Sequence, residues 1–106
     1  MNRVVLSESA RRDRQSITAY TVNHFGIAQA EKLMGQFEAV LDILAQSPHL
    51  GRERPELDPP GHSFRYLSIM KTFVLVYRSV GDRIEVARIL HGAQSLAEEL
   101  DHDSGA

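Results

Sequence analysis

The side chains in this sequence that would do chemistry are mostly basic or aromatic, and most lie in its last third. An arginine or lysine stabilises developing negative charge on a phosphate, and a histidine exchanges protons near neutral pH. The set comprises Arg65, Tyr66, Lys71, Tyr77, Arg78, Arg88 and His91. Two functions would use it: a groove that cleaves RNA by general acid–base chemistry, or a contact surface for a protein with acidic segments. The ordinary alternative is a set of solvated arginines, a buried Tyr77 and a surface histidine.

Several other classes of site are excluded or disfavoured by the sequence. The chain has no cysteine, which excludes disulfides, thiolate metal sites and cysteine nucleophiles. Its histidines lack the spacing of a zinc motif, and no G-x-S-x-G sequence indicates a serine nucleophile. The segment at Gly51 has a single glycine, whereas a phosphate-binding loop needs several. We therefore predict no metal, no cofactor and no catalytic residues. The RNA-cleaving alternative would depend on Arg65, Lys71, Arg88 and His91.

The first half of the chain predicts one strand and two helices. Arg3–Leu6 is a short β-branched run, and Ser7 is a suitable N-cap for a helix that ends before Gly26. From Ile27 apolar residues recur at spacings of three and four, which predicts a second helix that ends near Gln46, ahead of Pro48. One face of the first helix carries a thin apolar stripe with polar members: Ala10, Asp13, Ile17, Tyr20 and His24. The short joint between the helices predicts a hairpin.

The second half predicts a loop over residues 47–63 and three strands. The strands are expected at 63–69, 71–78 and 83–91, with a tight turn at Gly81 and a short helix over 95–100 before a frayed end. In the last strand, Ile84, Val86, Arg88 and Leu90 are expected on one face. The fold prediction is a single α+β domain over residues 1–106, ordered from about residue 3 to 100, with the order β-α-α-β-β-β. A helical hairpin would cover one face of a mostly antiparallel four-stranded sheet.

The length of the chain and the distribution of its charges give predictions about its cellular location and its partners. A chain of 106 residues whose apolar runs are far shorter than a membrane span, and whose N-terminus lacks a signal-peptide core, predicts a cytoplasmic protein without membrane contact. Residues 63–92 are basic, whereas the tail from residue 93 carries four carboxylates and no lysine or arginine. This pattern indicates a surface that attracts an acidic partner, or a tail that lies back across the basic segment.

Short motifs along residues 4–92 give the chain a family resemblance. They are Leu6-Ser7-Glu8-Ser9-Ala10, Asp13 with Ile17 and Tyr20, Phe25-Gly26 with Ala30, Leu44-Ala45-Gln46-Ser47-Pro48, Gly51-Arg52, Arg54-Pro55-Glu56-Leu57, Phe64-Arg65, Val74-Leu75-Val76-Tyr77-Arg78, and Val86-Ala87-Arg88-Ile89-Leu90-His91-Gly92. In their order and spacing, the chain resembles the ParE toxins of the RelE/ParE superfamily of bacterial toxin–antitoxin systems.

The resemblance implies a toxin with the strand and helix order given above, held inert in a hetero-oligomer with an antitoxin. It implies a ParD-like antitoxin, a ribbon–helix–helix protein with a disordered tail, and a role in plasmid stabilisation without direct sequence-specific DNA binding by this chain. ParE-like members poison DNA gyrase, whereas RelE-like members cut messenger RNA on the ribosome. Many relatives place a cation soon after the last His-Gly, but here Ala93-Gln94-Ser95 follows Gly92. We therefore favour the gyrase-binding function over ribosome-dependent endoribonuclease activity, with a toxin fold that has lost its activity as a third hypothesis.

The antitoxin is expected to lay an amphipathic helix into a groove beside the first helix, or on the sheet face that the helices leave uncovered. An exposed apolar patch would follow from such a surface. The predicted partner-binding residues are Arg11, Arg12, Arg65, Tyr66, Arg78, Arg88 and His91.

Overall fold

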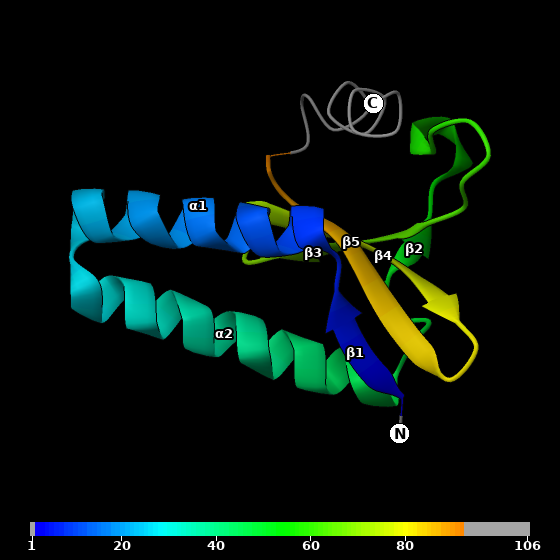
Figure 1. Ribbon diagram of the computed structural model, residues 1–106, viewed down its shortest axis with the longest axis horizontal. Coiled ribbons are helices and arrows are strands. Elements are labelled where there is room, and N and C mark those ends of the chain that lie inside the picture. Colours follow the sequence, from blue (N-terminus) through cyan, green and yellow to red (C-terminus); the bar gives the residue numbers. More distant parts are fainter. Residues whose placement is uncertain (1, 93–106) are drawn as a thin grey trace.

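Strand β1 (Arg3–Leu6) leads directly into helix α1 (Glu8–Phe25), as the computed structural model of the chain shows (Figure 1). The structure describes residues 2–92. Ser7 makes the predicted cap: its Oγ accepts a hydrogen bond from Ala10 N–H at 3.0 Å. The same hydroxyl donates to the Ala87 carbonyl at 2.8 Å. Ser7 therefore starts the helix and also fixes that start against the last strand.

Helix α2 (Ile27–Gln46) folds back along α1 through a one-residue joint at Gly26. Gly26 has φ 90°, a conformation that favours glycine, and its N–H closes α1 by donating to the Val22 carbonyl. The hairpin projects beyond the ends of the strands (Figure 1). Tyr20 and His24, at the end of the stripe predicted along α1, are exposed, whereas Ala10 near its start is buried.

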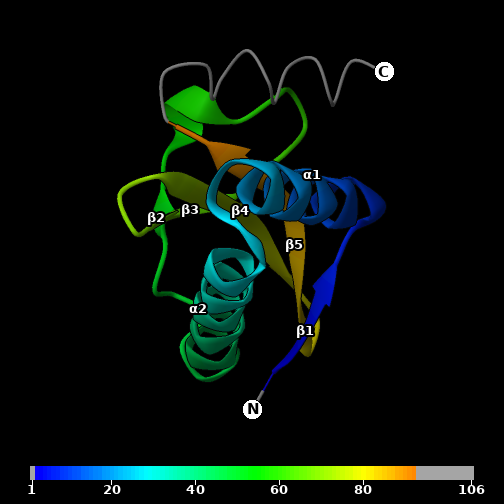
Figure 2. The ribbon, with the colours of Figure 1, turned by 90° about the vertical axis from the view of Figure 1, so that its left-hand side faces the viewer.

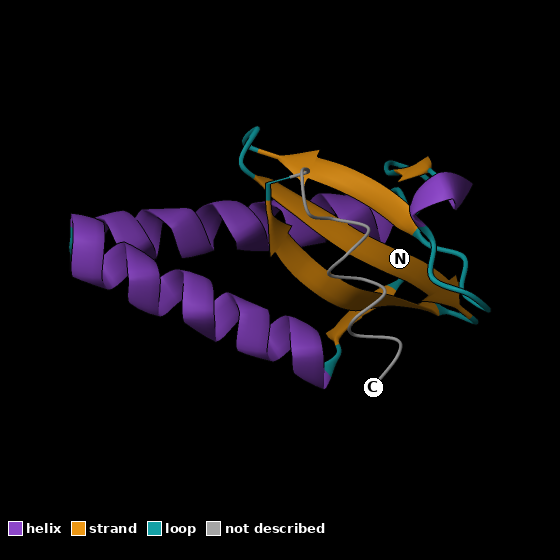
Figure 3. Ribbon diagram, turned by 90° about the horizontal axis from the view of Figure 1, so that it is seen from above, coloured by secondary structure: helices purple, strands orange, loops and turns teal. Residues whose placement is uncertain are grey.

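The sheet has the strand order β1-β5-β4-β3-β2 and is antiparallel except for the β1–β5 pair. Figure 3 shows the strands side by side, together with the helical hairpin. Its other strands are β2 (Arg52–Glu53), β3 (Arg65–Ile69), β4 (Phe73–Val80) and β5 (Arg83–His91). The α+β class is confirmed, but the prediction of four strands missed β2. That strand consists of two exposed charged residues, so it has no apolar alternation to reveal it. A 3₁₀ turn, η1 (Pro55–Leu57), follows it.

Strand β4 begins two residues later than predicted, because the turn before it uses an unusual backbone. Met70 and Lys71 have φ of 55° and 62°, and Thr72 N–H donates to the Ile69 carbonyl at 3.1 Å. Two consecutive positive φ values are typical of the tight hairpin turns that match strand twist, although glycine or asparagine usually supplies them. The predicted turn at Gly81 is present, with Val80 paired to Arg83.

A β-bulge in β5 changes which of its side chains face the helices. The register shifts between Val76 and Tyr77, so that Ala87 is the extra residue. Ile84 and Val86 face the helices as predicted on one face, but beyond the bulge Ile89 joins that core and Leu90 lies on the opposite face. The expectation that Arg88 and Leu90 share a face with Ile84 was therefore wrong.

The sheet carries an apolar cluster on each face. The two helices lie on one side of the sheet (Figure 2). The cluster under them includes Phe37, Leu44, Leu75 and Tyr77. The opposite face carries a second one, which we call the outer cluster: Phe64, Tyr66, Val74, Val76 and Leu90, with Leu57 and Ala87 packed against it. The uncovered sheet face that the sequence predicted is thus itself a buried apolar layer. The helix predicted over residues 95–100 and the frayed end after it lie outside the described residues.

The close contact between Gly51 and Tyr77 predicts that position 51 has no room for a side chain. A Cβ at Gly51 would lie 2.7 Å from Tyr77 Cε1 and 3.1 Å from the Tyr66 carbonyl oxygen, and the Tyr77 ring is fully buried. We expect Gly51→Ala to lower the free energy of unfolding by about 1–3 kcal/mol, measured by urea denaturation. The control is Gly35→Ala, in mid-helix with open space around it, which should raise stability by about 0.5–1 kcal/mol. Equal effects of the two changes would contradict this account.

Candidate functional site

An open, largely apolar groove of about 810 Å³ lies between the helical hairpin and one end of the sheet. It is lined by Ser16, Ile17, Tyr20, Thr21, Phe25, Gln29, Leu33, Thr72, Phe73 and His91. Tyr20 and Phe25 are 57% and 67% exposed, unusually high for aromatic side chains that line one surface. Within residues 2–92, the lining includes no carboxylate, lysine or arginine. The groove therefore suits an apolar segment of a partner better than a phosphate group.

The floor of the groove is built from aromatic rings in tilted and edge-on contact. Phe73, the first residue of β4, contacts Phe37 of α2 at 5.3 Å between ring centroids. His91, which pairs with Phe73 across the strands, meets the same ring edge-on at 5.3 Å. Tyr20 and Phe25 of α1 line the same groove and remain largely exposed. His91 thus belongs to an aromatic floor, and within residues 2–92 its ring contact is with Phe73 rather than with an acidic or basic side chain.

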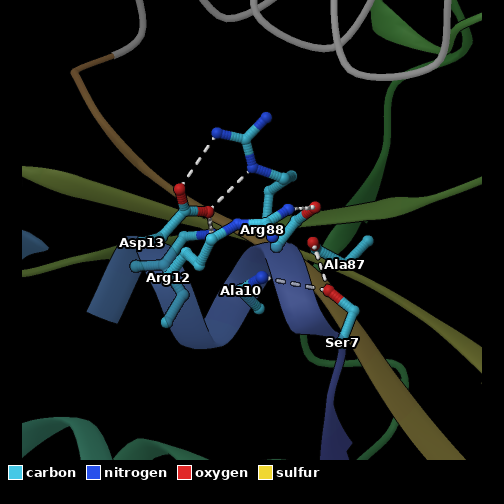
Figure 4. Close-up of polar contacts among 8 residues, drawn as sticks. Ser7, Ala10, Arg12, Asp13, Ala87 and Arg88 are labelled. Carbon is cyan, nitrogen blue, oxygen red and sulfur yellow. Dashed lines mark hydrogen bonds and ion pairs between the residues drawn. The ribbon is translucent and has the colours of Figure 1, made fainter. Parts of the chain in front are cut away.

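Arg88 is held by Asp13 and does not point into the groove (Figure 4). Its Nε and Nη2 donate to the two Asp13 carboxylate oxygens at 2.8 and 3.0 Å, and Ile89 N–H donates to the same carboxylate at 2.9 Å. Both side chains are largely buried, with 13% of Arg88 and 16% of Asp13 exposed. This bidentate ion pair, which we call the Asp13–Arg88 clamp, fixes α1 against the part of β5 that extends past its pairing with β1.

Arg65 and Tyr77 hold the loop after α2 against the sheet. Arg65 Nη1 donates to the Gly51 carbonyl at 2.9 Å, and its Nη2 lies 3.3 Å from a Glu53 carboxylate oxygen. The Tyr77 hydroxyl accepts from Gly51 N–H at 2.7 Å and donates to the Pro48 carbonyl at 2.8 Å. Burial raises the pKa of Tyr77, so its phenol remains a hydrogen-bond donor. Both residues therefore have structural partners.

Two further predicted partner-binding residues also have partners within the fold. The Tyr66 hydroxyl donates to Asp58 at 2.7 Å, and burial together with that carboxylate raises the pKa of Tyr66. Arg78 pairs with Glu85 at 3.0 Å across β4 and β5, partly in water.

The remaining predicted residues lie at the surface. Arg12 pairs with Glu8 at 3.0 Å on α1, and both side chains are well exposed. Arg11 lines a shallow hollow of about 460 Å³ on another side of α1, together with Arg14, Gln15, Thr18 and Ala19. Lys71 is exposed in the β3–β4 turn.

The four residues of the RNA-cleaving alternative do not converge on one point. Arg65 pairs with Tyr77 in the sheet, whereas His91 pairs with Phe73, four residues or about 13 Å away along β4. Arg88 pairs with Val76 and faces the outer cluster, whereas His91 lies on the helix side. Lys71 lies near His91 in the chain fold, since Gly92 N–H donates to the neighbouring Thr72 carbonyl at 2.8 Å. The structure thus brings together two of the four residues.

Most of the groove lining was not singled out from the sequence. Tyr20 was predicted only as a member of the stripe along the first helix, and Phe25 only as part of the joint before Gly26. The available signal was the apolar tip Phe25-Gly26-Ile27, where two large side chains flank a glycine that ends a helix. No group of three or more metal-ligating side chains occurs in the part of the chain that the structure describes. Searched over the same residues, neither helix has the length and apolar character to cross a membrane.

Comparison with known proteins places these features in a family. The sequence model of the ParE toxin of type II toxin–antitoxin systems, parDE, matches residues 4–96. Toxin ParE1 of Mycobacterium tuberculosis H37Rv is 32% identical over 100 residues, which span 93% of this chain and 98% of that protein. Toxin ParE3 of Caulobacter vibrioides is 28% identical over 100 residues, spanning 94% and 96% of the two chains.

A solved structure shares the fold. The chromosomal ParDE toxin–antitoxin system from P. aeruginosa contains a chain that superposes with a TM-score of 0.72, covering 88% of this chain and 98% of that one. At 24% sequence identity this likeness supports the architecture of hairpin and sheet.

The Asp13–Arg88 clamp predicts a large stability cost when its charge is removed. We expect Asp13→Asn to lower the free energy of unfolding by about 2–4 kcal/mol, because the change removes one partner of a largely buried pair and leaves the Arg88 guanidinium short of an acceptor. Glu8→Gln breaks an exposed pair on the same helix and should cost no more than about 0.5 kcal/mol. Urea unfolding of both variants measures the difference. A cost for Asp13→Asn as small as that of the control would show that the clamp does not stabilise the fold.

Proposed function

Because this chain belongs to the ParE toxin family of type II toxin–antitoxin systems, we propose that it binds and inhibits DNA gyrase, and that a ParD-like antitoxin keeps it inactive. The proposed action needs no catalysis by the chain itself: the toxin would occupy a surface of the topoisomerase and stall it. Gyrase acts on DNA in the cytoplasm, so we propose that the toxin acts there as well. Its biological role in this proposal is the maintenance of the plasmid or chromosomal locus that encodes it.

The separation of the basic residues is the observation that supports a binding function. A phosphate-cleaving site needs a proton donor or acceptor and a cation within reach of one phosphate. Here Arg88 is bound to Asp13 on the outer side, and Arg65 is bound to Gly51 and Glu53 about 13 Å along β4 from the position of His91. Arginines that are bound to carboxylates and carbonyls of their own fold stabilise that fold and have few donors left for a transition state.

The groove is the surface that we assign to the antitoxin. Its exposed Tyr20 and Phe25 offer anchors for apolar side chains that recur every three or four residues on a partner helix. A disordered antitoxin tail can fold as it enters such a groove, and the apolar area it buries offsets the loss of chain entropy. The cations of α1, including Arg11 and Arg12, lie exposed on the same helix and are available to acidic residues of the partner.

Expression without the antitoxin tests the proposed target. We expect inducing the chain alone in a sensitive bacterial host to stop growth, relax a reporter plasmid and raise the DNA-damage response, with intact transcripts. A gyrase subunit variant that restores growth would strengthen the assignment.

The alternatives give different readouts in the same experiment. Cleaved transcripts with normal plasmid supercoiling would replace gyrase inhibition with ribosome-dependent RNA cleavage, and His91→Ala and Lys71→Ala would then be the variants to examine. Normal growth and normal supercoiling, with the protein shown to accumulate, would indicate a toxin fold that has lost its activity.

A single charge in the groove should weaken antitoxin binding. The probe is the purified ribbon–helix–helix protein encoded beside this chain, and the measurement is its dissociation constant by titration calorimetry. We expect Phe25→Asp to weaken binding at least tenfold, because a carboxylate would have to lose water against an apolar helix. The control is Ile43→Asp, which adds the same charge at an exposed apolar position of α2 outside the groove and should change binding less than twofold. Equal weakening by both variants would place the antitoxin elsewhere.

A further inference from the structure

The pairing of β1 with β5 brings two arginines together at one end of the sheet. The two strands lie side by side (Figure 1), and their register places Arg3 directly opposite Arg83. Neighbouring strands are about 4.8 Å apart, so the two guanidinium groups extend from adjacent backbone positions. Like charges directly opposite each other destabilise a sheet. A local arrangement that costs stability is expected where function requires it, which makes this pair a candidate for binding.

The described chain supplies no carboxylate to neutralise the pair. Across residues 2–92, six other arginines form ion pairs with carboxylates: Arg12, Arg14, Arg54, Arg65, Arg78 and Arg88. Within the same residues neither Arg3 nor Arg83 forms one. Glu85, two positions after Arg83, is bound to Arg78 at 3.0 Å. The guanidinium groups of Arg3 and Arg83 are therefore available to an anion from another molecule.

Both arginines lie on the outer face, the side of the sheet turned away from the helices. The residues of β1 and β5 that pack into the core under the helices are Val4, Leu6, Ile84 and Val86. Side chains alternate along a strand, so Arg3 and Arg83 face the other way. The same alternation and register place Val5 and Val80 on the outer face beside them, each partly exposed. The surface around the pair is therefore partly apolar.

This end of the sheet is remote from the groove that we assign to the antitoxin. Arg83 begins β5, whereas His91, in the groove lining, ends it. The eight positions between them span about 26 Å along the strand. The groove also lies on the helix side of the sheet, and the pair on the outer face. A helix held in the groove therefore leaves the arginine pair to a second partner.

The surroundings of the pair favour a protein carboxylate over a nucleic-acid backbone. The planar fork of an arginine suits both carboxylate and phosphate. A nucleic acid binds when several of its phosphates are neutralised, but Asp82 and Glu85 lie within two positions of Arg83 and the whole chain has a net charge of −2. Val5 and Val80 add apolar area, and arginine beside apolar groups is typical of protein–protein interfaces.

We propose that Arg3 and Arg83 together bind one carboxylate of an acidic, partly apolar segment on the protein that this toxin inhibits. The apolar neighbours of that carboxylate contact Val5 and Val80. This inference rests on the proposed function, because the partner that it concerns is the target, which is gyrase in that proposal. It adds the surface of the toxin that holds the target, at the other end of β5 from the groove.

Inhibition of purified gyrase tests the role of the pair, with plasmid supercoiling as the measurement. Arg3→Gln combined with Arg83→Gln removes both charges and keeps side chains that form hydrogen bonds. We expect this double variant to raise the toxin concentration that halves supercoiling at least tenfold. The matched control combines Arg52→Gln with Lys32→Gln, two exposed cations that form no ion pair within residues 2–92. The control should change that concentration less than twofold.

The outcomes separate this inference from the proposed function. No inhibition by the unmodified chain would remove the proposed function, and the inference with it. Full inhibition by the Arg3 and Arg83 double variant, or an equal loss in both double variants, would overturn the inference alone.

Two binding measurements on the same double variant identify other occupants of the pair. We expect its dissociation constant for the antitoxin to change less than twofold, and a tenfold increase would assign the pair to the antitoxin. Fluorescence anisotropy with a short DNA duplex, without gyrase, should not distinguish the double variant from the unmodified chain. Tenfold weaker DNA binding by the variant would assign the pair to a nucleic-acid backbone.

A charge reversal distinguishes loss of binding from loss of folding. Arg83→Glu places a carboxylate directly opposite Arg3, so that the fold itself supplies the anion. We expect the melting temperature at low salt to rise by about 2–5 °C, because an opposite-charge pair replaces a like-charge pair. Gyrase inhibition should fall at least tenfold in the same variant. A variant that inhibits fully, or one that melts at a lower temperature, would contradict the proposal.

Discussion

The carboxylate of Asp13 joins the two layers of this protein. It accepts two hydrogen bonds from the Arg88 guanidinium and a third from the Ile89 backbone, so it connects the first half of α1 to the part of β5 that extends past β1. Ser7 makes a second connection one and a half turns earlier on the helix, through its hydroxyl and the Ala87 carbonyl. Two polar contacts on one side of α1 set the angle at which the hairpin leaves the sheet. The groove exists because the hairpin, held at that angle, extends beyond the last strand residues.

The β-bulge makes the Asp13–Arg88 clamp possible. Without an extra residue at Ala87, strict alternation would place Arg88 under the helices with Ile84 and Val86, where its charge would be buried in the apolar core. The bulge turns Arg88 to the outer face, where it binds Asp13. It also turns Ile89 and His91 toward the helices, which extends the core toward the groove. The one extra residue, Ala87, thus allows Arg88 to form a stabilising ion pair and places His91 in the aromatic floor of the groove.

The parts of the fold that the sequence predicted depend on local chemistry. Ser7 followed by Glu8 marks a helix start, Gly26 marks the joint, and Gly81 marks a turn, because each property belongs to a few neighbouring residues. The parts that it did not predict depend on pairing between distant residues. Strand β2 forms only because Arg52 and Glu53 lie against Tyr66 and Arg65, and the bulge is a property of the β4–β5 register. The groove was not predicted for the same reason. Tyr20 and Phe73 lie far apart in the sequence, and no local sequence pattern indicates that their segments come together.

The parallel pairing of β1 with β5 bears on how this protein is made. Arg3 pairs with Arg83, and the Ser7 hydroxyl reaches a carbonyl 80 positions later in the chain. During synthesis the first strand therefore has no partner in the sheet until Arg83–Val86, the first part of β5, has emerged from the ribosome. Contacts of such long separation slow folding and delay the assembly of the sheet to the end of synthesis. Truncated translation products consequently lack both the finished sheet and the groove, which ties any harmful activity to complete synthesis of the polypeptide.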